Sequence, residues 1–499
     1  MVTSTPKPSR FPRLLKPNVL LATGIITILS CHGVIAGQVG DDWSRLPPPA
    51  TFGATTVTAA ATDLESRLRI LESQNAQFAR QQQTLIRDLK ALSQRYDDLK
   101  QRTLGVGGYE DDVGAFVLVP GTTARPFELR ADFYTEARYN NFSRNAEFFV
   151  DSTGTQQPIE NVRAVEVTRN FIHFSGFALD PKLQFTAIVF SSTALNDTLY
   201  LGWINYRFSD ALDIRIGNWV LPGTREWYES FRYTLGADRL MATTFFRPNT
   251  TPGVWAQGKL LDRVRYVAMW GNSSNRFSQG IERLGAPRAF SGTVWWESTG
   301  DFGRGPSDIE FHETPSLRLG ASMTTSKEVN QGLGEIVGGN PEDTILRLSD
   351  GTPLFRNGAL APGVQLASTQ YNLWAIDAAI KYRGMSLSGE YFFRLLNDFR
   401  TDSGTVPFDS LFDHGGLLQG GAFLKPGVEL YARTSCVTGR FGSGYEYGGG
   451  ANWYPKCSRE WRFTFEVLQL NDSPAENILT GYRAGQSGTL YQLQWFVDF

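Results

Sequence analysis

The sequence predicts an all-β transmembrane barrel of 16 antiparallel strands, preceded by a periplasmic α-helical coiled coil. From about residue 126 onward, apolar and charged residues alternate with a period of two, as in strands with one polar and one apolar face. Tight turns alternate along the chain with longer, polar, Gly-rich connections. After the N-terminus no stretch has the roughly 18 apolar residues of a spanning helix, so a membrane would have to be crossed by strands.

Composition and charge exclude several other classes of protein. The 499 residues carry a formal net charge of −2, and removal of four N-terminal cations (Lys7, Arg10, Arg13 and Lys16) would leave −6. The chain therefore lacks the basic excess of a nucleic-acid-binding protein. Its four histidines and three cysteines are scattered without metal-ligand spacing, so the sequence predicts no metal site and no cofactor.

Residues 1–36 have the pattern of a secretory signal peptide. Basic residues precede an apolar run over residues 19–31, and the small residues around Ala36 resemble a cleavage site. An alternative is a loose lipobox at residues 28–31, in which Cys31 would be acylated. Residues 37–61, rich in Pro, Thr, Ala and Gly, are predicted to form a flexible linker.

Residues 62–103 carry a heptad seam, with spacings of four and three throughout. The seam residues are Leu64, Leu68, Leu71, Asn75, Phe78, Gln82, Leu85, Leu89, Leu92, Tyr96 and Leu99. A strict seven-residue repeat favours supercoiling with partner helices, which predicts a homo-oligomer. A helix folded back on its own barrel is the alternative. Asn75 and Gln82 either set register and oligomeric state or are simply tolerated polar residues.

Residues 104–124 are predicted to be a second linker, and residues 125–499 the barrel. Phe127, Leu129 and Ala131 alternate with Glu128 and Arg130, and the same pattern recurs near residues 212–216, 317–323, 374–382 and 461–467. Tight turns are expected at 180–181, 209–210, 261–262, 383–384 and 425–427. The last strand alternates to a terminal Phe499, which resembles the assembly signal of bacterial outer-membrane proteins.

Two local stretches, residues 217–227 and residues 377–391, together with Phe499, resemble the phosphate-selective porin O and P family. The resemblance covers most of the chain from the coiled coil onward. It implies a trimer of 16-stranded barrels, a third extracellular loop folded into the pore, and inward-facing basic residues that draw anions.

Transferred to this chain, the third loop spans about residues 219–252. The predicted constriction residues are Arg225, Glu226, Glu229, Arg232, Asp238, Arg239 and Arg247. The predicted pore-lining wall residues are Arg130, Arg138, Arg215, Arg265, Arg318, Lys381, Glu390, Arg394, Arg433 and Arg462. The loop mixes both signs of charge, and residues 125–499 have a net charge of about −4. Any one of these charges could simply pair and hold the loop, whereas as a set they would favour one ion sign.

The predicted function is passive diffusion of small ions and hydrophilic solutes through an outer-membrane porin, with anion or phosphate preference as an open hypothesis. The expected partners are outer-membrane lipid and two further copies in a homotrimer. A structural protein that tethers the outer membrane to the cell wall through its coiled coil is the alternative. No Ser/His or Asp/His motif indicates a barrel enzyme.

The cysteines provide a topological expectation. Cys436 is expected in an outer loop and Cys457 in the following periplasmic turn, separated by a strand over residues 445–454. That strand would be roughly 30 Å long. Because a disulfide needs Cα atoms within ~7 Å of each other, no bond between the two is expected.

Overall fold

The computed structural model describes residues 126–194, 197–274, 288–299, 302–330 and 342–499. Before residue 126 it also describes residues 108–110 and 115–122, and positions 67, 69–75, 77–78, 81–82 and 84. The chain divides into two units, one within residues 12–106 and one that contains residues 107–499. Each unit is described by itself.

In the first unit, the described positions between 67 and 84 are helical and exposed. The Ser73 hydroxyl donates a hydrogen bond to the carbonyl of Ile70 (2.8 Å), three residues earlier in the helix. Leu71 and Phe78, both on the predicted seam, are 60% and 66% exposed. Asn75 and Gln82 are also helical and exposed, whereas Leu68, Leu85, Leu89 and Leu92 lie outside the described residues. Within the described part of the chain, no helix is both long and apolar enough to cross a membrane.

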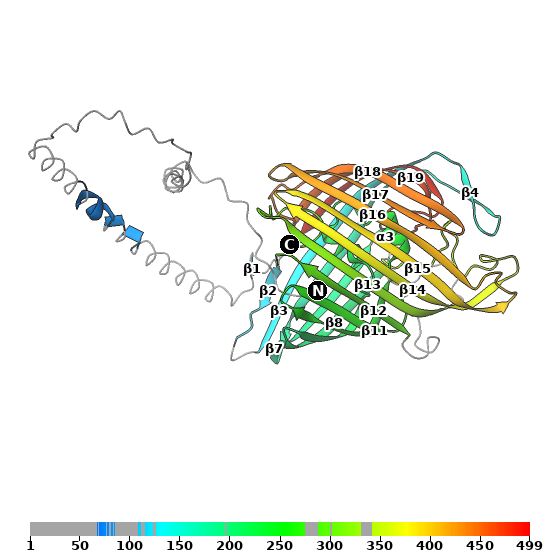
Figure 1. Cartoon of the computed structure of the whole chain (residues 1–499), viewed down its shortest axis with the longest axis horizontal. Helices are drawn as coiled ribbons and strands as arrows, with labels where there is room; N and C mark the ends of the chain where they lie inside the picture. Colours follow the sequence, from blue (N-terminus) through cyan, green and yellow to red (C-terminus); the bar gives the residue numbers. More distant parts are fainter. Residues whose placement is uncertain are drawn as a thin grey trace, which may run out of the picture. The chain divides into compact units, whose positions relative to one another are not determined.

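The second unit is a closed antiparallel barrel (Figure 1). Its sheet has 18 strands, and setting aside the short β1 (Gly108–Glu110) and β2 (Ala115–Val119) leaves a ring of 16, as predicted. The ring consists of β3 (Phe127–Arg144), β6 (Val162–Ala178), β7 (Asp180–Ser192), β8 (Asp197–Ser209), β9 (Leu212–Val220), β10 (Thr250–Leu261), β11 (Val264–Gly271), β12 (Ala289–Glu297), β13 (Ser316–Val329), β14 (Gln365–Tyr382), β15 (Met385–Ser403), β16 (Ser410–Lys425), β17 (Val428–Gly439), β18 (Gly442–Trp453), β19 (Trp461–Ser473) and β20 (Gln486–Asp498).

The first and last ring strands close the barrel. β20 pairs with β3 from Arg144 down to Tyr134, and the backbone amides of Phe133 and Phe499 then donate to each other's carbonyls at 2.6 and 2.9 Å. Beyond Phe499, β2 takes over the same edge of β3, with Phe116 paired with Ala131. β1 in turn pairs with β2. The segment 104–124, expected to be a linker, therefore contains two strands of the sheet.

The two ends of the barrel differ, largely as predicted. At one end, called the turn end, lie Phe127 and Phe499 and the tight connections 210–211, 262–263, 383–384 and 426–427. The opposite, loop end carries the connections called L1 (145–161), L3 (221–249), L5 (330–364) and L8 (474–485); L1 holds the hairpin of β4 (Phe148–Val150) and β5 (Gln156–Pro158). Two connections break the rule: β12 and β13 are joined by a long turn-end segment, 298–315, and β17 and β18 by only Arg440 and Phe441.

Because β17 continues to Gly439, Cys436 lies in this strand and not in an outer loop, which corrects the prediction. Its side chain is exposed on the outer face of the barrel, and Cys457 lies in the turn-end connection between β18 and β19. Both cysteines are free, as expected.

Candidate functional site in the barrel lumen

The barrel wall has its apolar face outside and its charged face inside. On β14, the outward Trp374 and Ile376 are 42% and 56% exposed, whereas the inward Asp377 and Lys381 are 7% and 0% exposed. Near the turn end, the outward rings of Trp453, Phe463 and Trp495 stack across three neighbouring strands, with centroids 5.3 and 6.1 Å apart. An apolar belt with an aromatic girdle and a polar interior is the arrangement of a barrel that spans a lipid bilayer.

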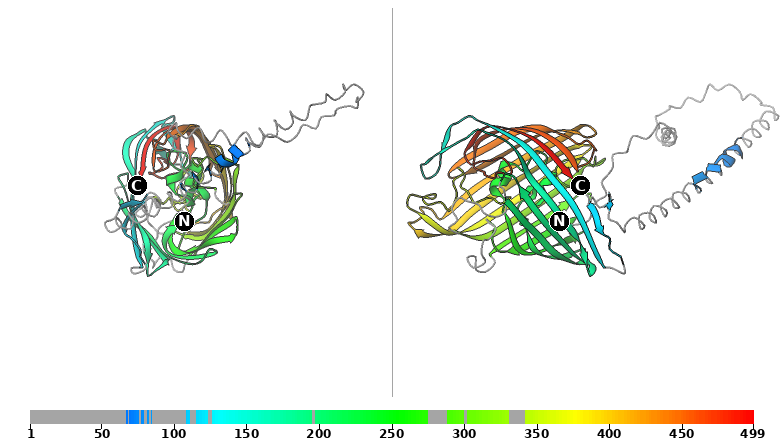
Figure 2. Two further views of the ribbon diagram at one scale, coloured as in Figure 1. Left: turned by 90° about the vertical axis from the view of Figure 1, so that its left-hand side faces the viewer. Right: turned by 180° about the vertical axis from the view of Figure 1, so that it is seen from behind.

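Loop L3 enters this polar interior. It contains α2 (Arg225–Tyr228), the 3-10 turn η2 (Phe231–Tyr233) and α3 (Met241–Phe246), and most of its residues are buried. Figure 2, whose left view looks along the barrel, shows green chain segments inside the ring of strands, and green is the colour of this part of the sequence. L3 begins after β9 and ends before β10, and it makes polar contacts with β15, β18 and β19 on the far part of the ring, so it crosses the lumen.

On one side of the lumen, L3 is fixed to β3 and β6 through Asp238. The carboxylate of Asp238 accepts hydrogen bonds from Arg138 (2.8 Å) and Arg169 (2.6 Å), both of which are fully buried. Glu136 also pairs with Arg169, at 3.0 Å. Burial alone would raise the pKa of Asp238, but Arg169, Arg138 and Arg239 outweigh it and hold that pKa well below its usual value. Asp238 is therefore held in its ionised form at neutral pH by two cations of the wall.

On the other side of β20, the same loop tip is held by carboxylates of β18 and β19. The backbone amide of Ala237 donates to Glu466 (3.1 Å), and that of Met241 donates to Glu446 (2.6 Å). Arg433 on β17 pairs with Glu466 at 2.6 Å and also donates to the carbonyl of Asp238 at 2.6 Å. These buried bonds satisfy backbone groups that L3 would otherwise leave unpaired inside the wall.

The beginning of L3 is fixed to β15. Glu390 accepts hydrogen bonds from the backbone amides of Arg225 (2.6 Å) and Glu226 (3.2 Å), so a wall carboxylate binds the first turn of α2. The Arg225 side chain pairs with Glu229 at 3.0 Å, and Glu229 in turn pairs with Arg318 on β13 at 3.1 Å. The carboxylate of Glu226 accepts the amide of Leu240 (3.2 Å) and ties the two halves of the loop together.

The middle of L3 descends to the turn end. Arg232 pairs with Asp498, near the end of β20, at 2.9 Å, and with Asp132, near the start of β3, at 3.3 Å. The following residues accept hydrogen bonds from the wall: the side-chain amide of Asn452 on β18 donates to the carbonyl of Leu235 (2.8 Å). L3 thus reaches from the loop end of the barrel into the part of the lumen near the turn end.

The helix α3 packs on the wall with its apolar side chains. Phe246 stacks on Phe392 of β15 with ring centroids 5.2 Å apart, and the Tyr371 hydroxyl donates to the Phe246 carbonyl (2.8 Å). An added Cβ on Gly415 would lie 2.8 Å from the Phe246 ring, so only glycine leaves room for this close approach. Figure 1 places α3 within the outline of the barrel, near β16.

Loops L5 and L8 cover L3 from the loop end. Glu342 of L5 pairs with Arg239 of L3 at 3.0 Å and also contacts Arg169. In L8, Asn477 donates to the Glu342 carbonyl (3.1 Å), and the Tyr482 hydroxyl donates to Glu446 (2.6 Å). Near the loop end, the lumen is therefore filled by three inward loops that share one polar network.

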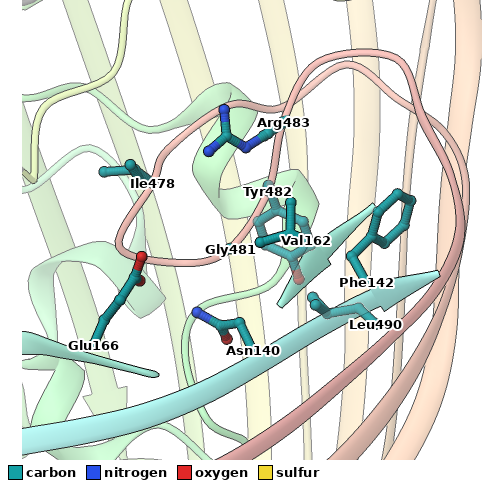
Figure 3. A pocket seen from close by; sticks show the side chains of 9 residues that line it. All are labelled: Asn140, Phe142, Val162, Glu166, Ile478, Gly481, Tyr482, Arg483 and Leu490. Atoms are coloured by element: carbon teal, nitrogen blue, oxygen red, sulfur yellow. The ribbon is translucent and has the colours of Figure 1, made fainter. Parts of the chain in front are cut away.

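A pocket remains beside L8, between this loop and strands β3 and β6 (Figure 3). It is lined by Asn140, Phe142, Val162, Glu166, Ile478, Gly481, Tyr482, Arg483 and Leu490. Its lining combines one acidic and one basic side chain with apolar groups, so the pocket has no single sign of charge.

The structure places every predicted constriction residue in L3, and all except Arg247 belong to the polar contacts given above. Arg247 lies over the Trp227 ring at 3.7 Å and donates to the Glu342 carbonyl. Of the predicted wall residues, those 8% exposed or less lie inward among the loops: Arg138, Arg215, Arg318, Lys381, Glu390, Arg394, Arg433 and Arg462. Arg130 and Arg265 also lie on the inward face but are only half-buried.

Sequence reasoning missed the residues that bring distant segments together. Glu136 and Arg169 form the wall side of the Asp238 cluster, Glu342 comes from L5, and Glu446 and Glu466 bind the backbone of L3. Charge at an inward position of a strand was the available signal, and it identified their neighbours. It did not distinguish acids that bind the backbone of a loop from acids that face water.

No protein-family model matches the chain, and no curated protein matches its sequence. Solved structures with a similar fold include an anion-selective porin from Comamonas acidovorans (11% identity, TM-score 0.44, 74% of this chain and 99% of that one). Another is the outer-membrane channel DcaP of Acinetobacter baumannii (7% identity, TM-score 0.46, 76% of this chain and 99% of that one). A third is OmpF of Salmonella typhi (10% identity, TM-score 0.45, 74% of this chain and 98% of that one). Similarity at this level assigns no activity to the chain.

Proposed function

We propose that this chain is an outer-membrane porin through which small ions and hydrophilic solutes diffuse passively. The observation that carries the proposal is a closed 16-stranded ring with an apolar exterior and a charged interior, crossed by an inward loop. A soluble barrel would bury its apolar face instead. In this proposal the turn end faces the periplasm, as in outer-membrane barrels with short periplasmic turns.

The solute is sieved by size and by the balance of charge in the lumen. Arg225, Arg232 and Arg239 of L3 each pair with a carboxylate within 3.3 Å. Paired charges largely cancel at the distance of a passing ion. This pairing supports a general porin over a strongly phosphate-selective one.

Single-channel recording of the purified mature protein in a planar bilayer tests the proposal. We expect discrete conductance steps, and a salt gradient should give a small reversal potential that phosphate changes little. Folded protein that produces no steps would contradict the pore and favour the tethering protein.

We further propose that residues 62–103 form a trimeric periplasmic coiled coil. Exposure of Leu71 and Phe78 on the helix supports a partner that covers the seam. In the full chain, Leu71→Asp combined with Phe78→Asp should weaken the trimer because two apolar seam layers would receive charge. Light scattering after size exclusion in detergent measures the oligomer, and Glu72→Asp, off the seam, is the control. An unchanged mass would contradict the coiled coil as the source of association.

A further inference from the structure

The long connection between β12 and β13 lies at the end of the barrel where other connections are short. Its described residues 302–315, called the inner turn, are buried from Gly305 to Ile309. A long connection that projected into water would leave such residues exposed. The inner turn therefore folds against the barrel.

Cations from other parts of the wall hold the inner turn. Arg459, in the connection between β18 and β19, pairs with Glu310 and donates to the carbonyls of Arg304 (2.9 Å) and Ser307 (3.0 Å). Lys381 of β14, inward and fully buried, donates to the Arg304 carbonyl at 3.2 Å. Four strands, β14 to β17, separate β13 from β18 in the ring, so the contacts of Arg459 draw the turn across the mouth of the lumen.

A second anchor joins the inner turn to the connection between β14 and β15. Asp308, fully buried, accepts the backbone amide of Gly384 (2.7 Å), and the amide of Arg383 donates to the His312 carbonyl (2.8 Å). The ligand atoms of Asp308, Glu310 and His312 lie within 4.8 Å of one another. Because Arg459 already binds the Glu310 carboxylate, and a backbone amide and His312 bind Asp308, we assign the three to the fold of the turn.

The inner turn meets L3 inside the lumen. Gly305, with φ +61°, lies so close to η2 that an added Cβ would be 2.6 Å from the Cβ of Tyr233. Arg304 contacts the Tyr233 hydroxyl and lies over its ring at 5.3 Å. Phe302, 1% exposed, lies under the cations of Arg225 (5.3 Å) and Lys381 (4.6 Å). A loop from one end of the barrel and a turn from the other thus touch.

Arg304 differs from the arginines of L3 that line the same region. Its side chain is exposed, and among the described residues it has no carboxylate partner. Arg225 and Arg232, by contrast, are each paired with two carboxylates. An unpaired, exposed cation in a narrow passage attracts anions and repels cations.

We propose that the inner turn and η2 of L3 form a second constriction near the periplasmic mouth, and that Arg304 gives this constriction a preference for small anions. The inference rests on the proposed porin function. The inference adds to the porin function a specific place and a specific residue at which the sign of the permeating ion is selected.

Two measurements on the full chain test it. The first measurement tests the position of the inner turn. A variant that carries Gly305→Cys and Tyr233→Cys, together with Cys436→Ser and Cys457→Ser to remove the native thiols, should form a disulfide on mild oxidation, since the two side chains are adjacent. Gly303→Cys replaces Gly305→Cys in the control, because Gly303 also has a positive φ (+75°) but faces Glu310. Equal cross-linking of the two pairs, or none in either, would overturn the placement of the turn. This readout does not depend on conduction.

For selectivity, Arg304→Glu should move the reversal potential in a KCl gradient toward cations, and Arg304→Gln should give an intermediate value. Arg400→Glu, the same charge change at an exposed position on the loop side of β15, is the control and should leave the potential near that of the unaltered protein. If Arg304→Glu and Arg400→Glu shift the potential equally, or neither does, Arg304 does not select. An unaltered chain that does not conduct would refute the porin function itself, while the disulfide would still report the constriction.

Discussion

Replacement of L3 by a two-residue Asn-Gly turn is expected to raise the single-channel conductance several-fold. Val220 and Thr250, which flank the loop, are already paired across β9 and β10, so a tight hairpin turn can join them without disturbing the ring. The excision removes α2, η2 and α3 from the lumen, and with them the contacts that cross it. The conductance in a planar bilayer, compared with that of the intact chain, measures the effect.

A matched excision separates this effect from general loosening of the loop end. Shortening the connection 404–409 between β15 and β16, whose Gly404 lies against Gly363 and Val364 of L5, should leave the conductance unchanged. Circular dichroism should show strand content retained in both variants. An L3 excision that folds but conducts like the intact chain would mean that L3 does not limit the passage.

The substitution Asp238→Asn is expected to destabilise the barrel by about 3–5 kcal/mol, the usual cost of removing one partner from a buried ion pair. Asparagine keeps the size of the side chain but leaves the buried Arg138 and Arg169 short of one negative charge. The free energy of unfolding in urea, followed by tryptophan fluorescence, is the measurement.

Asp398→Asn provides the control for this prediction. Asp398 pairs with Arg400 at 2.9 Å, but the two side chains are 48% and 68% exposed. Exposed pairs contribute about 0–1 kcal/mol, so the unfolding free energy should change little. A loss at Asp238 no greater than that at Asp398 would show that the cluster at the tip of L3 does not stabilise the barrel.

Much of the barrel could be predicted from the sequence because lipid and lumen impose opposite demands on neighbouring residues. On β14, for example, the alternation of outward Trp374 and Ile376 with inward Ala375 and Asp377 predicted both the strand and its inward face. The position of L3 was also predicted, to within two or three residues at each end. The extent of β17 was underestimated, because Thr434 to Thr438 carry small side chains whose alternation is weak.

The contacts inside the lumen were less predictable, because they join residues far apart in the sequence. Arg459 and Lys381 hold the inner turn, yet neither is near it in the chain, and the turn itself has no periodic pattern. Likewise, the role of Glu390 as an acceptor for the backbone of α2 depends on where L3 comes to rest. Charge pattern locates such residues on the inner face but does not choose their partners.

The short strand β2 has a mechanical consequence. It is paired with the barrel through three registered residue pairs with β3, at the turn end and next to Phe499. A force applied to the chain upstream of residue 108 would reach β1 and β2 before it reached the 16-stranded ring, and would peel them from β3 one pair at a time. Peeling breaks hydrogen bonds in sequence and needs little force, whereas the ring has no free edge at which to begin. Under such a force β1 and β2 would therefore detach from β3 first, and the 16-stranded ring would stay folded.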